Sequence, residues 1–92
     1  MITRHYSTID SKTGHTLVLS GVSYNIAMDW LQEEVAKFGK EIFRCENIDD
    51  TRTVISTGKP KHDFDFDGNR TTWYTNIVKF YYIEDRGVLL QE

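Results

Sequence analysis

Apolar positions between residues 23 and 38 follow the spacing of an amphipathic helix, and they form two faces rather than one. At about 100° per residue, Ile26 and Trp30 fall on one side, one turn apart, next to Glu33 and Lys37. The opposite stripe is the expected core face, and it contains Tyr24, Ala27, Met28, Leu31, Val35 and Phe38. A chain this small can bury only one such face by itself, so the Trp30 side needs a cover.

Turn residues and alternating patterns predict strands on both sides of this helix. Before it, Ile2–Ile9 and His15–Ser20 form a predicted hairpin, because residues 10–14 are a turn cluster ending in glycine. After it, Gly58 to Pro60 is an expected break, since proline cannot donate a hydrogen bond to a sheet ladder. The strands expected after the helix are residues 41–47, 51–57, 62–66, 70–83 and 88–90.

These elements predict an α+β fold in the order β-β-α-β-β-β-β, give or take one strand. A single helix packed on a mainly antiparallel sheet of about five to six strands satisfies that order. The strand at 70–83 carries apolar groups on both faces, which is typical of a strand that is central or covered on both sides. With 92 residues, we expect residues 1–92 to form one domain with one core.

Composition narrows the class of protein only modestly. A net charge of −3 gives no basic footprint for nucleic acid, and we expect none as a partner. The single cysteine, Cys45, excludes an internal disulfide framework and favours a cytoplasmic location. We expect Cys45 to be an ordinary buried residue of its strand. The apolar runs are too short for a membrane span, and Arg4 and Asp10 interrupt any leader after Met1.

The sharpest local motif runs from Asp63 to Asn69 and matches the first half of a calcium loop. Carboxylates at Asp63, Asp65 and Asp67 alternate before Gly68, as in D-x-D-x-D-G. The second half fails, because the twelfth position is Tyr74 rather than a bidentate glutamate. An amphipathic strand closed by an Asp-Gly hairpin turn explains the same letters. A divalent-cation or small-ligand site at these three aspartates is the alternative.

No other pattern indicates catalysis. The histidines are scattered, the serines lie in no nucleophile motif and the glycines form no phosphate-binding loop. We therefore expect no cofactor and lean against an enzyme. Lys59, Lys61 and Arg70 stand near several aromatic residues, but the neighbouring aspartates would repel phosphate.

The sequence favours a small non-enzymatic protein–protein interaction or assembly module. The surface that it presents would be the Trp30 side of the helix, with Ile26, Glu33 and Lys37, or an aromatic sheet face. Three alternatives remain for what buries Ile26 and Trp30: the rest of this chain, a second copy in a homo-oligomer, or a different protein. Chains of this size without catalytic motifs are common among phage and mobile-element accessory proteins, including inhibitors of host machinery.

Overall fold

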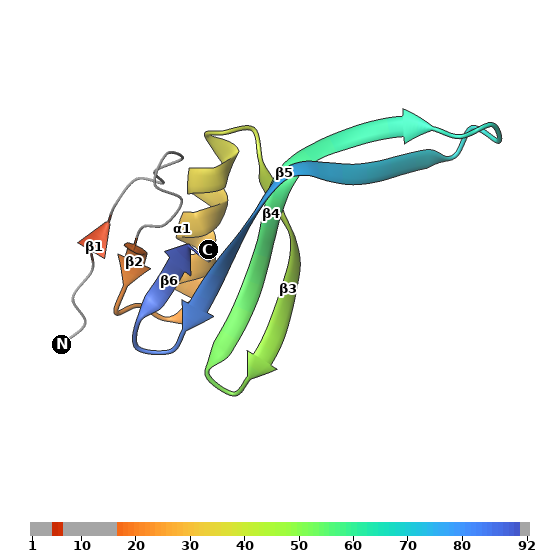
Figure 1. Cartoon of the computed structure of the whole chain (residues 1–92). Helices are drawn as coiled ribbons and strands as arrows, with labels where there is room; N and C mark the ends of the chain where they lie inside the picture. Colours follow the sequence, from red (N-terminus) through yellow and green to blue (C-terminus); the bar gives the residue numbers. More distant parts are fainter. Residues whose placement is uncertain (1–4, 7–16, 91–92) are drawn as a thin grey trace.

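The computed structural model describes residues 5–6 and 17–90. In the described residues a six-stranded antiparallel sheet has the strand order β1-β2-β6-β5-β4-β3, and a single helix lies against it (Figure 1). The elements are β1 (His5–Tyr6), β2 (Leu17–Ser20), α1 (Tyr24–Ala36), β3 (Glu41–Asp49), β4 (Arg52–Phe64), β5 (Arg70–Ile83) and β6 (Gly87–Leu90). The predicted α+β class and element order are confirmed.

Helix α1 forms where the apolar stripe predicts it, and the middle of the expected face is buried. Ala27, Leu31 and Val35 are buried against the sheet, and Met28 packs against them in part. The expectation is wrong for the two ends of the stripe, because Tyr24 at the start of the helix and Phe38 beyond its end are 37% and 47% exposed. The helix ends at Ala36, two residues before the predicted end, because Gly39 adopts a left-handed conformation at φ 70°. The amide of Lys40 then donates to the carbonyl of Val35 at 3.0 Å, which closes the helix end.

The core lies between α1 and the sheet face formed by β2, β6, β5 and β4. Ile55 on β4 is paired with Phe80 on β5, and both are almost fully buried. Tyr82 continues this face, and its hydroxyl donates to the carbonyl of Val22 at 3.2 Å. Leu19 and Val88 complete the buried set from β2 and β6.

The predicted antiparallel pairing of the first two strands is confirmed where both are described, since His5 is paired with Ser20 and Tyr6 with Leu19. The rest of the predicted hairpin, including residues 2–4, 7–9 and 15–16 of its strands and its turn at residues 10–14, lies outside the described residues. Strand β6 forms as predicted and joins β2 to β5. Within the described part of the chain, no helix is both long and apolar enough to cross a membrane.

The predicted break at Gly58–Pro60 is wrong, because β4 runs through it as one strand to Phe64. Strand β3 ends its pairing with β4 at Gly58, so beyond that point β4 has β5 as its only described neighbour. Proline is tolerated there because its nitrogen can face the free edge rather than a ladder.

Beyond this point β4 and β5 leave the sheet together and project away from α1 as a long hairpin (Figure 1). We call residues 59–75 the arm. The expectation that β5 is central holds for Phe80–Ile83, which lie between β4 and β6. It fails in the arm, where many of the side chains are exposed. The arm accounts for the long axis of 55 Å.

Candidate functional site

The arm is anchored at its base by an aromatic contact with β3. The rings of Phe43 and Tyr74 stack with centroids 4.1 Å apart and an interplanar angle of 10°. The Tyr74 hydroxyl donates to a Glu41 carboxylate oxygen at 3.0 Å, and this bond, followed by burial, raises the pKa of Tyr74. The backbone at this point is tight, because a Cβ on Gly58 would lie 3.1 Å from the Thr75 carbonyl oxygen.

A bulge separates the arm from the sheet. Thr57 is paired with Val78, but Lys59 is paired with Thr75, so β5 has one more residue than β4 across this step. Asn76 absorbs the extra residue with a positive φ of 52°. Bulges bend and twist the ladder, which explains why the hairpin changes direction here (Figure 1).

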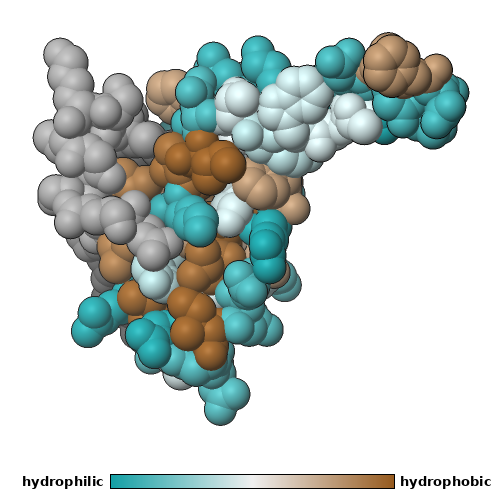
Figure 2. Space-filling model, turned by 45° about the vertical axis from the view of Figure 1, so that its right-hand side comes forward, coloured by the Kyte–Doolittle hydropathy of each residue, from teal (hydrophilic) through white to brown (hydrophobic). Residues whose placement is uncertain are grey.

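The arm and its base expose large apolar side chains. Phe66 in the turn is fully exposed, and Phe64, Trp73 and Ile77 are 68%, 46% and 53% exposed. Figure 2 shows the arm as mainly pale and teal groups with a hydrophobic group near its end. Because large apolar side chains exposed on a projecting hairpin are uncommon, the arm is a candidate recognition surface.

The turn at the tip explains the calcium-like motif. Oδ1 of Asp65 accepts hydrogen bonds from the amides of Asp67 at 2.9 Å and Asn69 at 2.8 Å. Gly68 supplies the positive φ of 80° that the turn requires. Asp63 Oδ1 accepts instead from the amide of Phe64. No group of three or more metal-ligating side chains occurs in the described ranges, so the structure adds no support to the cation alternative.

Charges along the arm are separated by position. Lys59 and Lys61 are near the base, and Lys40 lies close enough that Lys59 contributes, after burial, to lowering its pKa. The tip region holds Asp63, Asp65 and Asp67. On one face His62 Nδ1 lies 3.0 Å from both the Thr72 hydroxyl and an Arg70 guanidinium nitrogen. The arm is therefore positive near the body and mainly negative towards its end.

The predicted helix interface is only partly available. Trp30 is half-buried and packs against the core, so this chain itself covers much of the ring. Ile26 is 38% exposed, and Glu33 is exposed beside it. Lys37 is also exposed and forms an ion pair with Glu34 at 2.8 Å. Of the covers considered for Trp30, internal packing accounts for part of its surface.

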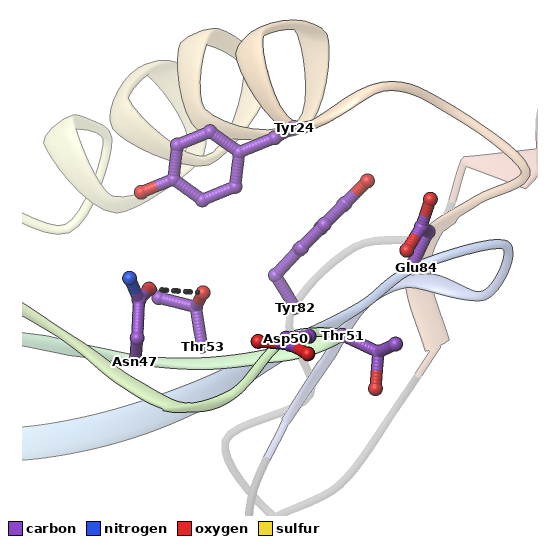
Figure 3. Close-up of a pocket in the computed structure, with 7 residues that line it drawn as sticks. All are labelled: Tyr24, Asn47, Asp50, Thr51, Thr53, Tyr82 and Glu84. Atoms are coloured by element: carbon purple, nitrogen blue, oxygen red, sulfur yellow. Dashed lines mark hydrogen bonds between the residues drawn. The ribbon is translucent and has the colours of Figure 1, made fainter.

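An open pocket of about 470 Å³ lies between the start of α1 and the β3–β4 turn. Figure 3 shows Tyr24 from the helix facing the sheet residues Tyr82, Asn47 and Thr53. The two tyrosine rings meet edge to face at 5.2 Å, and the Thr53 hydroxyl donates to the Asn47 side-chain oxygen at 2.9 Å.

Carboxylates give this pocket its electrostatic character. Burial, then Glu84 and Asp85, raises the pKa of Tyr82. Glu84 and Asp50 are also among the lining residues. The site would attract a cationic group and repel an anion.

Cys45 is exposed, so the expectation of a buried cysteine is wrong. It lies on β3, the outer strand of the sheet, where neighbours cover only one edge. Burial, followed by a hydrogen bond with Cys45, raises the pKa of Tyr24.

In comparisons with known proteins, no family model, no curated protein and no solved structure matches this chain. The class that the fold defines is an α+β domain with one described helix on an antiparallel sheet. Its most distinctive feature is the projecting arm. Sequence reasoning missed the arm because alternation predicts a strand without telling whether a third strand lies beside it. The signal that could have found it is Pro60 between two lysines, which is typical of a free edge.

Proposed function

We propose that this chain is a non-enzymatic protein–protein interaction or assembly module whose recognition element is the arm. The observation that carries the proposal is the exposure of Phe64, Phe66 and Trp73 on a hairpin that leaves the folded body. Aromatic residues on a protruding element are the usual anchors of protein interfaces. An accessory protein of a phage or mobile element, acting in the cytoplasm, fits this role.

A protein partner fits the arm better than a nucleic acid does. Three aspartates occupy the outer part of the arm, where a nucleic-acid-binding hairpin would need positive charge. The basic side chains near the base are balanced by these carboxylates, and the whole chain has a net charge of −3.

The test compares the full chain with an arm-shortened variant in which Asn-Gly replaces residues 62–72. Lys61 and Trp73 are directly paired, so a two-residue turn can join them. We expect a stoichiometric protein, either a second copy or a different chain, to co-purify with the tagged full chain and to be lost from the variant. The Phe64→Ser/Phe66→Ser double variant keeps the arm backbone and controls for the loss of aromatic groups alone.

Equal co-purification by the full chain and the arm-shortened variant would contradict the proposal. Salt-sensitive retention on heparin that disappears with the arm would also contradict it, because such retention indicates phosphate binding.

A further inference from the structure

The two edges of the arm differ in how they are protected against pairing. The outer edge of β4 carries Lys59, Pro60, Lys61 and Asp63, and both proline and charge discourage the addition of a strand. The outer edge of β5 has no proline, and residues 71–78 carry no charged side chain. Among the described residues, β6 pairs with β5 only at Phe80–Ile83, so this uncharged stretch has an open edge.

The pairing register shows which amides of β5 point outward. Pro60 is paired with Tyr74 and has no N–H to donate. In an antiparallel ladder alternate pairs exchange hydrogen bonds, and the others turn their backbone groups away. Proline is accommodated where its nitrogen faces away from the neighbouring strand. The backbone N–H and C=O groups of the Pro60–Tyr74 pair therefore point away from each other, towards the two free edges of the arm. The His62–Thr72 pair, two residues further, is outward-facing for the same reason.

We propose that two copies of this chain pair their arms in antiparallel orientation, β5 edge to β5 edge, about a two-fold axis at Trp73. This inference rests on the proposed function and names a second copy as the partner. The outward backbone N–H and C=O groups of Thr72 then form hydrogen bonds with those of Tyr74 of the second copy. By symmetry, those of Tyr74 form hydrogen bonds with those of Thr72 of the second copy. At the centre, Trp73 of one copy lies directly opposite Trp73 of the other. The two residues form a non-hydrogen-bonded pair, the type of pair in which opposite side chains are closest.

Charge complementarity selects a second copy in this orientation. Antiparallel pairing brings the acidic tip of each arm to the basic base of the other. With the axis at Trp73, Thr71 lies opposite Thr75 of the second copy. Asp63, which is paired with Thr71, is therefore level with Lys59 of the second copy, which is paired with Thr75. A parallel arrangement would place tip beside tip and base beside base, which like charges disfavour.

The decisive measurement is the oligomeric state of the full chain and two proline variants by sedimentation velocity over a wide concentration range. Thr72→Pro removes an outward amide from the β5 edge, whereas His62→Pro removes one from the β4 edge. Both variants remove the His62–Thr72 side-chain contact, and His62→Pro also removes the contact between His62 and Arg70. His62→Pro therefore disturbs the arm at least as much as Thr72→Pro does, but it blocks the other edge. Circular dichroism checks that each variant keeps its fold.

We expect the full chain and His62→Pro to dimerise, and Thr72→Pro to raise the dimer dissociation constant about tenfold or more. Added salt should also weaken the dimer, since exposed charges are screened.

A full chain that stays monomeric would overturn the inference, as would a dimer that Thr72→Pro leaves intact or that only His62→Pro disrupts. If the full chain is monomeric but a different protein co-purifies in an arm-dependent way, self-pairing fails and the interaction proposal stands. If shortening the arm changes neither self-association nor co-purification, both proposals fail.

Discussion

Trp30 and Ile26 lie one turn apart on α1, but their surroundings differ. Trp30 packs against the core of its own chain, while Ile26 is exposed. A helical pattern identifies which residues share a side, but it does not say how far neighbouring strands reach around that side. The sequence therefore found the pair and could not divide it into a packing residue and a surface residue.

A pair of alanine variants separates these two roles. Trp30→Ala should lower the free energy of unfolding by about 2 kcal/mol, because it removes a large side chain that is only partly buried. Ile26→Ala should change it by less than about 0.5 kcal/mol. Urea denaturation of both variants is the measurement. Equal, small effects would show that Trp30 contributes little to the core and is available for an interface.

The carboxylate of Asp49 gives the β3–β4 turn a measurable pH dependence. Hydrogen bonds from Arg52, from the Thr51 amide and from the Thr51 hydroxyl lower the pKa of Asp49 from 3.8 to about 2. A pKa that folding lowers stabilises the protein above the unfolded value, and this stabilisation is lost as the pH falls through the folded value.

We therefore expect Asp49→Asn to be less stable than the full chain above pH 3.8, with the difference disappearing as the pH approaches about 2. Urea midpoints of both proteins across this range provide the measurement. The asparagine keeps an oxygen acceptor, so the comparison isolates the charge. A difference in stability between the two proteins that does not change with pH would contradict the lowered pKa of Asp49.

At the scale of elements, the turns depend on backbone conformations that only some residues adopt. Gly87 begins β6 with a φ of 79°, and Gly39, in the turn that follows α1, has a φ of 70°. A Cβ on Gly87 would collide with the Leu19 carbonyl and would lie 2.6 Å from the Ser20 Cα. Nothing lies within 4 Å of a Cβ on Gly39. The two glycines share a conformation but differ in the space around them.

Alanine at the two glycines should accordingly have unequal effects. Gly39→Ala should cost about 1 kcal/mol for the backbone conformation alone. Gly87→Ala should cost about 3 kcal/mol or more, because the β2–β6 pairing must also shift. Thermal unfolding of the two variants checks this order. A Gly87→Ala protein as stable as Gly39→Ala would mean that β6 does not approach β2 as closely as described.

At the scale of the whole molecule, body and arm are distinct in their contribution to stability. Among the described residues, the buried hydrophobic side chains lie between Leu19 and Val88, and none of them belongs to residues 59–75. The arm-shortened variant should therefore unfold within a few degrees of the full chain when both are monomeric. A cooperative thermal transition followed by circular dichroism is the measurement. A collapse of the transition would show that the arm supports the core.

Elements that depend on local sequence were predicted correctly. The helix, the β5 range and the β6 strand were predicted, because side-chain periodicity and turn residues act locally. The alternation of Asp63, Phe64, Asp65 and Phe66 predicts a strand leading to a turn, and β4 ends at Phe64 before that turn. The exposure of Cys45 and the continuity of β4 through Pro60 were not predicted, because both depend on which strands lie at an edge.

The sequence by itself determined the element order, the buried middle of the apolar stripe of α1 and the turn at Gly68. These depend on backbone preferences and on the period of apolar residues within one segment. Only the tertiary structure decided that β3 stops pairing with β4 at Gly58 and that β4 and β5 continue alone as the arm. Pairing between strands distant in sequence is set by register and by the reach of neighbouring elements, which a local pattern does not contain. The arm, and with it the proposed interaction surface, is a product of that long-range pairing.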